Sequence, residues 1–176
     1  GIKVAVQGAG HVGQYLIKHL TDEGANVFVT DIHAPSLKEV SEKYGSTIVG
    51  LDEIYDLDVD VYAPCALGAT VNDATLERLK CSIIAGAANN QLQDEVLHGK
   101  AVMDKGIIYA PDYMLNAGGV INCFAEVDGR SSEWAMDKAA QIYDTTTDII
   151  NGSKANKIPT YAIANKMAED RIKGAL

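Results

Sequence analysis

The chain has 176 residues and a formal net charge of −9, a size that fits one domain and an acidity that argues against nucleic acid or an anionic membrane as its main partner. No apolar run approaches the roughly 20 residues of a membrane span, and no charged leader with a cleavage site opens the sequence. We therefore expect one soluble, cytoplasmic domain over residues 1–176 that binds neither nucleic acid nor a membrane.

The opening of the chain carries the strongest local pattern. Residues 2–6 form a short apolar run that predicts a buried parallel strand. Gly8, Gly10 and Gly13 follow as G-x-G-x-x-G, with apolar residues at helical spacing directly behind them. In such a strand–turn–helix unit the first glycine tightens the turn, the second lets the backbone approach a pyrophosphate, and the third lets helix and strand pack closely. Because the helix start offers unpaired N–H groups and the positive end of its dipole, this stretch predicts a dinucleotide site.

Asp31 stands at the carboxyl end of a second predicted strand, residues 27–29, and lies 18 residues after Gly13. A dinucleotide fold places at this point the acid that accepts hydrogen bonds from the adenosine ribose. The same carboxylate would repel a 2′-phosphate about 4 Å away by roughly 4 kcal/mol at an effective dielectric near 20, and by less where solvent screens it. Asp31 therefore favours NAD over NADP.

Strand and helix patterns alternate along the rest of the chain. The acidic stretch 52–58 is interpreted as a solvated surface turn. The expected strands are 46–49, 59–63, 82–85 and 107–109, and the expected helices are 35–44, 72–80 capped by Asn72 or Asp73, 94–105, one from about 131, and 159–173. This order predicts an α/β fold: a Rossmann-like, doubly wound, mostly parallel sheet with flanking helices and a helical C-terminal segment, whose ligands bind at the carboxyl ends of the strands.

Three connections that leave those carboxyl ends share an unusual composition. They are A-P-C-A-L-G-A, A-G-A-A-N-N-Q-L and A-P-D-Y-M-L-N-A-G-G-V-I-N. Small residues let a flat ring lie against the backbone, and amides can hold a carboxamide. Asn89, Asn90 and Asn116 are therefore candidates for contacting the ribose or nicotinamide, although Asn and Gly also make ordinary turns.

Several other side chains are given structural interpretations. The cysteines lack C-x-x-C spacing and are expected to be reduced core thiols: Cys65, Cys81 and Cys123. The histidines show no ligand spacing, so no metal site is predicted. Apolar residues at near-helical spacing in the long helix from about 131 are expected to be core, namely Trp134, Met136, Ile142, Tyr143 and Ile149.

Together the motifs G-A-G-H-V-G, A-P-C-A-L-G, A-A-N-N-Q-L, A-P-D-Y-x-x-N-A-G-G-V-I-N and I-P-T-Y resemble the cofactor domain of the glutamate/leucine/phenylalanine/valine dehydrogenases, and the leucine branch most. The resemblance covers nearly the whole chain. It implies reversible oxidative deamination of an L-amino acid to a 2-oxo acid and ammonia, with hydride passing to NAD.

The resemblance also implies a role for particular residues. The glycine turn would hold the pyrophosphate and Asp31 the ribose, while Asn89 would lie beside the nicotinamide ribose and Asn116 near the carboxamide and the substrate. The cofactor-binding residues implied in this way are Gly8, Ala9, Gly10, His11, Val12, Gly13, Asp31, Ile32, Cys65, Ala66, Leu67, Ala87, Asn89 and Asn116.

The last helix departs from the resembled pattern, because A-I-A-N-K-M-A-E-D-R stands where V-A-A-D-R-M-A-E-E-R is expected. In the family this helix contributes to the side-chain pocket, so Ala162 and Ile163 join Asn116 as candidate substrate contacts. Leucine is the preferred substrate, with phenylalanine, valine or another apolar amino acid as alternatives. Glutamate is disfavoured because these positions are small or apolar.

Amine oxidation by hydride transfer needs a general base and a group that fixes the substrate carboxylate. The three loops offer Cys65, Asp112, Tyr113 and several Asn but no Lys or His, and Asp112 is interpreted as a turn or cap residue. The resembled family carries its catalytic Lys pair and Asp on an N-terminal domain, which nothing in this chain matches.

We therefore expect an inactive NAD-binding fragment, without catalytic residues, of a longer two-domain and homo-oligomeric enzyme. Its expected partners are NAD(H), the amino-acid or 2-oxo-acid substrate, and the N-terminal catalytic domain of the same polypeptide. Residues 151–176 either pack on this domain or return toward the missing one. A stand-alone NAD-sensing regulatory module is the alternative from another functional class.

Overall fold

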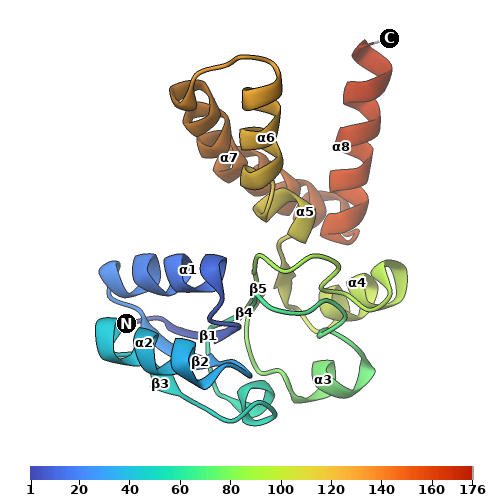
Figure 1. Cartoon of the computed structure of the whole chain (residues 1–176). Coiled ribbons are helices and arrows are strands. Elements are labelled where there is room, and N and C mark those ends of the chain that lie inside the picture. Colours follow the sequence, from blue (N-terminus) through green and yellow to red (C-terminus); the bar gives the residue numbers. More distant parts are fainter. Residues whose placement is uncertain (176) are drawn as a thin grey trace.

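The computed structural model describes residues 1–175 and contains a six-stranded sheet (Figure 1). Its strand pairs are all parallel, and the strand order is β3-β2-β1-β4-β5-β6. The strands, several of them shorter than predicted, are β1 Lys3–Gln7, β2 Asn26–Thr30, β3 Thr47–Ile48, β4 Val61–Pro64, β5 Ile83–Ile84 and β6 Ile108–Tyr109. The predicted doubly wound, Rossmann-like fold is confirmed. Because the order reverses between β1 and β4, the crevice for a ligand lies beyond the carboxyl ends of these two strands.

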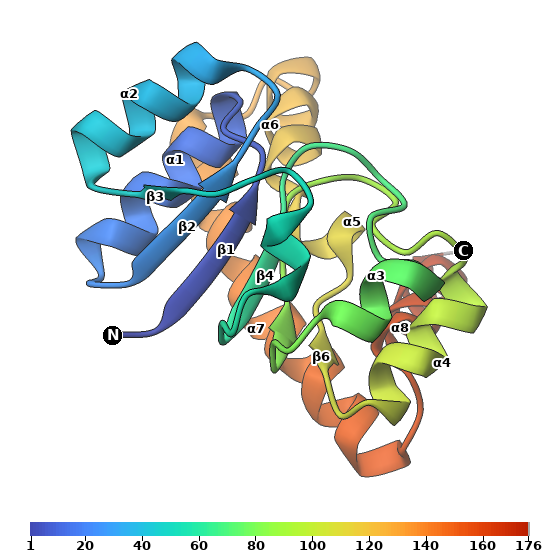
Figure 2. The ribbon, with the colours of Figure 1, turned by 90° about the horizontal axis from the view of Figure 1, so that it is seen from below.

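Helices pack on both faces of the sheet (Figures 1 and 2). α1 His11–Asp22 and α2 Ala34–Tyr44 cover one face over β1 and β2, and the 3₁₀ helix η1 Glu53–Asp56, α3 Asp73–Arg78 and α4 Glu95–Asp104 lie on the other. The chain then continues as α5 Asp112–Leu115, α6 Gly118–Val127, α7 Ser132–Asn156 and α8 Thr160–Ala175. Figure 1 shows α6 and α8 standing away from the sheet, so the molecule has a sheet layer and a helical layer.

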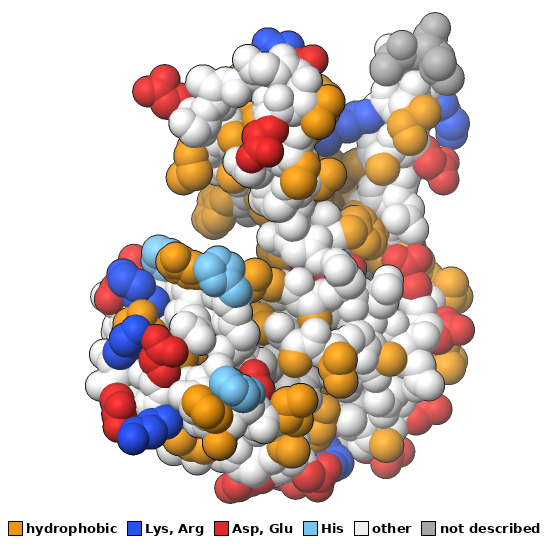
Figure 3. Space-filling model, in the orientation of Figure 1, with side chains coloured by type: hydrophobic (Ala, Val, Ile, Leu, Met, Phe, Trp, Pro, Cys, Tyr) orange, Lys and Arg blue, Asp and Glu red, His pale blue; other side chains and the backbone are white. Residues whose placement is uncertain are grey.

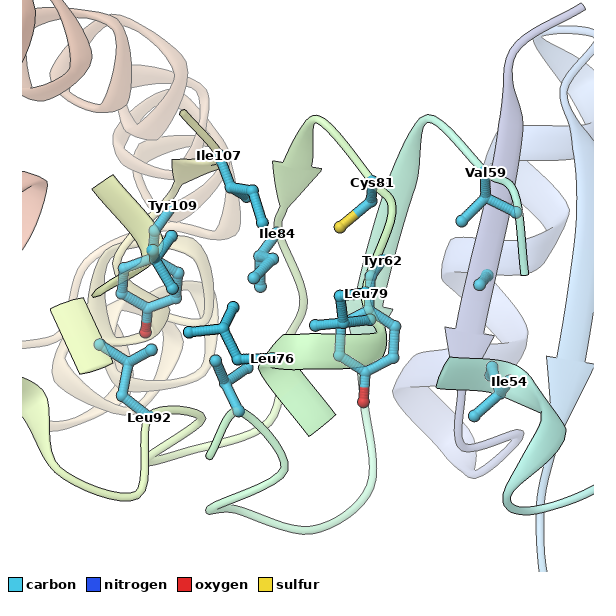
Figure 4. Packing of buried hydrophobic residues seen from close by; sticks show 13 residues of the cluster. Ile54, Val59, Tyr62, Leu76, Leu79, Cys81, Ile84, Leu92, Ile107 and Tyr109 are labelled. Atoms are coloured by element: carbon cyan, nitrogen blue, oxygen red, sulfur yellow. The ribbon is translucent and has the colours of Figure 1, made fainter. Parts of the chain in front are cut away.

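Side chains of successive strand residues alternate between two hydrophobic cores. In β1, Val4 and Val6 point into the core beneath α1 and α2, whereas Ala5 points into the core on the opposite face. Figure 4 shows the second core, where Tyr62 of β4 and Ile84 of β5 lie side by side. Both side chains are fully buried, and burial of each such side chain contributes about 1.5–3 kcal/mol. The two cores hold the ends of β1 and β4 rigidly in place.

The sequence signals for helix ends are confirmed by the hydrogen bonds. Asn72 Oδ1 accepts from the backbone N of Ala74 and of Thr75, both at 3.1 Å, and the Thr75 hydroxyl accepts from Asn72 N. This capping box starts α3 at the predicted residue. Gly45 ends α2 with φ +70°, a left-handed conformation that favours glycine.

The acidic stretch before β4 exposes the side chains of Asp52 and Asp58, as expected of a solvated stretch, but it forms more than the predicted turn. It contains η1, whose Ile54 is buried in the core. Arg78 of α3 donates to Asp52 at 2.8 Å and to Asp56 at 2.7 Å, and this guanidinium lowers the pKa of both carboxyls. The ion pairs fasten η1 to α3. The local sequence pattern could not reveal these ion pairs, because Arg78 lies 22 residues beyond Asp56.

The helical layer departs most from the prediction. α5 and α6 were not predicted, and Cys123 of α6 is exposed rather than a core thiol. In α7, Ile149 is buried, but Met136 and Tyr143 are 71% and 77% exposed. These helices pack largely on one another, so each buries one narrow stripe and leaves other apolar residues outside. Ile2, expected in the first strand, precedes β1 and is also exposed.

Candidate cofactor site

The glycine turn joins β1 to α1 at the crevice. Gly8 has φ +111°, and a Cβ there would lie 2.9 Å from the carbonyl carbon of Cys65. A Cβ on Gly13 would lie 2.1 Å from the carbonyl oxygen of Gly8. At Gly10, in contrast, a Cβ would meet no described atom within 4 Å. The fold therefore requires Gly8 and Gly13, whereas Gly10 borders open space in front of the turn.

α1 presents free main-chain donors to that space. Gly10 is its N-cap, and no described side chain caps the helix. The N–H groups of residues 11–13 have no partner within α1, because the first helical bond runs from Gln14 N to the carbonyl of Gly10 at 2.9 Å. In Figure 3 the front of the sheet layer is mostly white and orange, and its Lys and Arg side chains lie at the margins. An anion placed here would be held by N–H groups and the helix dipole, without a basic side chain.

Asp31 lies directly after β2 and binds the glycine turn. Its Oδ2 accepts from Ala9 N at 2.6 Å, and its Oδ1 accepts from His33 N at 2.7 Å. The sequence pointed to Asp31 by its position at a strand end, but it did not reveal the contact with Ala9. Because carboxylate oxygens have further lone pairs, this side chain can brace the turn and still accept from a hydroxyl in front of it.

Three other predicted residues lie at the surface around the turn. His11 is exposed and packs edge-on against Tyr15, with ring centroids 5.2 Å apart, which agrees with a histidine resting on its own helix. Val12 is 55% exposed and Ile32 is 89% exposed. An adenosine placed beside Asp31 would therefore contact the exposed apolar side chains of Val12 and Ile32.

The loops after β4 and β5 are bound to each other. Ala69 N donates to the carbonyl of Asn90 at 2.7 Å. A Cβ on Gly68 would lie 2.7 Å from the carbonyl oxygen of Asn89, so only glycine permits this approach. Cys65, at the start of the first loop, is half-buried, and burial raises the pKa of its thiol. A protonated thiol in such surroundings acts as a small packing residue.

The tip of the loop after β4 projects outward. Ala66 and Leu67 follow Cys65 there, and both are exposed. Ala66 also lies against the glycine turn, because its Cβ would be 2.9 Å from a Cβ built on Gly8. The loop after β4 thus forms one wall beside the turn, as a cofactor site between β1 and β4 requires.

Asn116 connects the third loop to the second. Its Nδ2 donates to Asn89 Oδ1 at 2.6 Å and to the carbonyl of Ala87 at 3.3 Å. The structure therefore brings together Asn89 and Asn116, both predicted at the nicotinamide end, and Ala87, predicted as a cofactor contact. Among described atoms, none is bonded to Asn116 Oδ1 or Asn89 Nδ2, so the pair retains one acceptor and one donor group for a ligand.

Gln91 supports this pair and was missed by sequence reasoning. Its side chain is fully buried, and Nε2 donates to the carbonyls of Gly86 at 2.7 Å and Ala88 at 3.0 Å. Its backbone N donates to Asp112 Oδ2 at 3.1 Å, and Asp112 Oδ1 accepts from Tyr113 N at 2.8 Å. Asp112 thus joins two loops through backbone groups, in agreement with its interpretation as a turn residue. The only sequence signal for Gln91 was its position directly after the two asparagines of the loop after β5.

Ala162 and Ile163 both lie in α8. Ile163 packs toward α7, with Cγ2 3.1 Å from the position of a Cβ on Gly152. Tyr113 links α5 to α8 by donating from its hydroxyl to Asn165 Oδ1 at 2.9 Å. Burial raises the pKa of Tyr113 to about 12, so this donor keeps its proton at neutral pH. No hydrogen bond among the described residues joins Ala162 or Ile163 to Asn116, and their role in substrate binding stays a prediction.

Two features are absent from the described residues. No group of three or more His, Cys, Asp or Glu among them is placed to hold a metal ion. Nor does any helix in residues 1–175 combine the length and apolarity needed to cross a membrane.

Comparison with known proteins shows which family the chain belongs to. A family model described as Glutamate/Leucine/Phenylalanine/Valine dehydrogenase matches residues 29–175. The chain belongs to this dehydrogenase family. Its fold and its relatives are those of NAD(P)-dependent amino-acid dehydrogenases, which are oxidoreductases.

Individual relatives of this chain differ in their named substrates. Leucine dehydrogenase of Thermoactinomyces intermedius is 51% identical over 172 residues, which cover 98% of this chain and 47% of the relative. Phenylalanine dehydrogenase of Bacillus thermotolerans is 43% identical over 174 residues, covering 96% of this chain and 45% of the relative. The crystal structure of L-tryptophan dehydrogenase from Nostoc punctiforme matches with a TM-score of 0.96 and 46% identity, over 99% of this chain and 53% of that one. The chain thus spans about half the length of the curated relatives it matches.

Proposed function

We propose that the chain is the NAD-binding domain of a longer enzyme that deaminates an apolar L-amino acid, leucine by preference, to its 2-oxo acid and ammonia. The observation that carries the proposal is the glycine turn with its uncapped helix start, which lies on the same sheet edge as the Asn89–Asn116 pair. The glycine turn suits a diphosphate, and the asparagine pair suits a carboxamide.

The residues present fit such a cofactor. The N–H groups of residues 11–13 would hold the diphosphate, in the space that Gly10 leaves open. Asp31 would accept from the adenosine ribose while it holds Ala9, and its negative charge favours NAD over NADP. Asn116 Oδ1 and Asn89 Nδ2 would accept from and donate to the carboxamide and the nicotinamide ribose. Bound NAD would supply the chemistry of hydride acceptance.

The groups that handle protons would come from outside these loops. Residues 63–72, 86–94 and 110–119 contain no Lys, Arg or His, and the carboxylate of Asp112 is occupied by backbone N–H groups. A general base and a cation for the substrate carboxylate would therefore be supplied by the N-terminal catalytic domain of the same polypeptide. What this chain contributes is binding, orientation and a surface of small residues against the ring.

Substrate choice within the proposal depends on the pocket of the parent enzyme. The relatives are named for leucine, phenylalanine and tryptophan, so similarity favours an apolar amino acid. Ala162 and Ile163 are small or apolar, whereas glutamate would need a cation or hydroxyl for its second carboxylate. Steady-state turnover of the parent with leucine, valine, phenylalanine and glutamate tests the proposal, which expects the highest kcat/KM with leucine.

The fragment itself gives the first test. Isothermal titration calorimetry of the 176-residue chain should show NADH binding, and the same sample should not oxidise leucine with NAD. Absence of binding would refute the cofactor assignment, and turnover would refute the assignment of the base to another domain. A stand-alone NAD sensor is the second candidate. Conversion of leucine by the parent would exclude the sensor, because a non-catalytic module converts no substrate.

A further inference from the structure

A cavity of about 350 Å³ lies at the edge of the sheet, toward the amino end of β6. α4, β6 and the end of α7 lie side by side around it (Figure 2). Gly106 and Ile107, which directly precede β6, line the cavity, whereas the cofactor loops follow the carboxyl ends of the strands. The cavity therefore shares no lining residue with the candidate cofactor site. Most of its lining side chains are apolar, among them Val102, Met103, Ile107, Tyr109 and Ile150.

Two lysines lie at this cavity without a partner in the described part of the chain. Residues 1–175 contain twelve lysines, of which seven pair with a carboxylate and three donate to a carbonyl or amide oxygen. The two without such a contact are Lys154 and Lys157, and both line the cavity. No carboxylate side chain lines it with them. Two positive charges are thus left uncompensated at one cavity of a chain whose net charge is −9.

The backbone of Lys157 is strained, although the local fold needs no lysine there. Lys157 is the C-cap of α7 and has φ +57° and ψ +43°, the left-handed conformation that glycine adopts readily and a lysine disfavours. Gly45 holds the corresponding position at the end of α2. Strained residues of this kind are common at binding sites, where the side chain is used. The conformation of Lys157 therefore indicates that its ammonium group has a role at the cavity.

A buried hydroxyl adds to the polar side of the cavity. Thr160 lines the cavity and is only 8% exposed, yet its hydroxyl has no hydrogen-bond partner among the described residues. A buried polar group of this kind costs stability unless a ligand or water satisfies it. Thr160 is also the first residue of the 16-residue helix α8, whose first N–H groups carry the positive end of the helix dipole. The lysines, the hydroxyl and the helix start therefore all favour an anion.

We propose that this cavity binds a small monocarboxylate with an apolar chain of about four to eight carbons. The carboxylate would lie between Lys154, Lys157 and the Thr160 hydroxyl, and the chain would lie against apolar residues such as Val102 and Ile150. A nucleotide is disfavoured, because the lining offers no amide or carboxylate side chain to bind the edge of a base. Inorganic phosphate is disfavoured, because most of the lining is apolar. The inference goes beyond the proposed function and does not depend on it.

An NMR chemical-shift titration of the full 176-residue chain tests the site, with hexanoate as the probe. Millimolar hexanoate should shift the backbone amides of Val102, Ile107 and Thr160. Hexanamide, which has the same chain without the charge, should bind at least about tenfold more weakly, and higher ionic strength should weaken hexanoate binding through screening. Absence of binding, equal binding of hexanamide, or shifts confined to the glycine turn at residues 8–13 would each overturn the proposal.

Lys157→Gly separates ligand binding from folding. Because glycine relieves the left-handed strain, the variant should be at least as stable as the unaltered chain in urea unfolding, while its affinity for hexanoate falls by about tenfold or more. Thr160→Val keeps the shape of the side chain and removes the hydroxyl, so it should weaken binding several-fold. Lys100→Met is the matched control, since Lys100 lies on α4, pairs with Asp104 and does not line the cavity. It should leave hexanoate binding unchanged.

Unchanged affinity for hexanoate in Lys157→Gly would overturn the proposal. An equal loss of affinity in Lys100→Met would also overturn it, because that result would show only a general effect of net charge. NADH binding is measured by calorimetry on the same samples. Failure of NADH to bind would refute the proposed function, whereas the hexanoate titrations report only on the cavity, so the two failures are distinguishable.

Discussion

Gly10→Val separates cofactor binding from folding, because the structure gives Gly10 no packing role. Its φ of −69° is open to any residue, and a Cβ there meets no described atom within 4 Å. The change should lower the free energy of unfolding by no more than about 1 kcal/mol, the usual cost of a poor N-cap residue. In the complex, the valine side chain would occupy the space proposed for the diphosphate. If two charge-assisted hydrogen bonds of about 1.5–3 kcal/mol each are lost, the Kd for NADH rises by roughly 10²–10⁴.

Gly13→Ala is the matched variant with the opposite expectation. Its Cβ would lie 2.1 Å from the carbonyl oxygen of Gly8, so the turn must move by about 1 Å, and overpacking of this kind costs about 1–3 kcal/mol. Urea unfolding followed by circular dichroism measures stability, and calorimetry with NADH measures affinity. A Gly10→Val chain of native stability that binds NADH normally would refute the diphosphate placement. A Gly10→Val chain less stable than Gly13→Ala would refute the argument from open space.

The other predictions concern the ribose, the asparagine pair and the ion pairs. Asp31→Asn should narrow the preference for NADH over NADPH by about tenfold or more in calorimetry, since even a screened repulsion of about 1.4 kcal/mol is a factor of ten; an unchanged ratio would contradict the ribose assignment. Asn116→Ala should reduce kcat of the parent more than it weakens NADH binding, because it removes the group that we propose lies nearest the substrate; equal effects would place the residue at the cofactor alone. Arg78→Met should lower the urea midpoint at pH 7, and this difference should shrink as the pH falls below about 3.9, the ordinary pKa of Asp, because the lowered pKa values of Asp52 and Asp56 give stability that is present above their ordinary pKa and is lost as pH falls through the folded values. A difference that stays constant as the pH falls would show that Arg78 acts mainly through packing on Tyr55.

The sequence predicted the local geometry of the candidate site where this geometry depends on contacts between neighbours in sequence. The glycine turn and the cap of α3 follow from residues a few positions apart, and the structure confirms their backbone geometry. The strand-end loops were also recognised, because Asn and small residues recur after successive strands. Gln91 was missed, since its meaning depends on carbonyls that only the folded loop brings within 3.0 Å.

The sequence by itself determined the alternation of strands and helices, the βα turn and a family resemblance that the comparisons confirm. These features rest on side-chain periodicity and backbone freedom, which act over a few residues. Only the tertiary structure decided that Asp31 braces Ala9, that Arg78 anchors the acidic stretch, and that Asn116 touches Asn89. Each of these depends on groups at least 22 residues apart, whose approach is set by the packing of the whole sheet rather than by any local pattern.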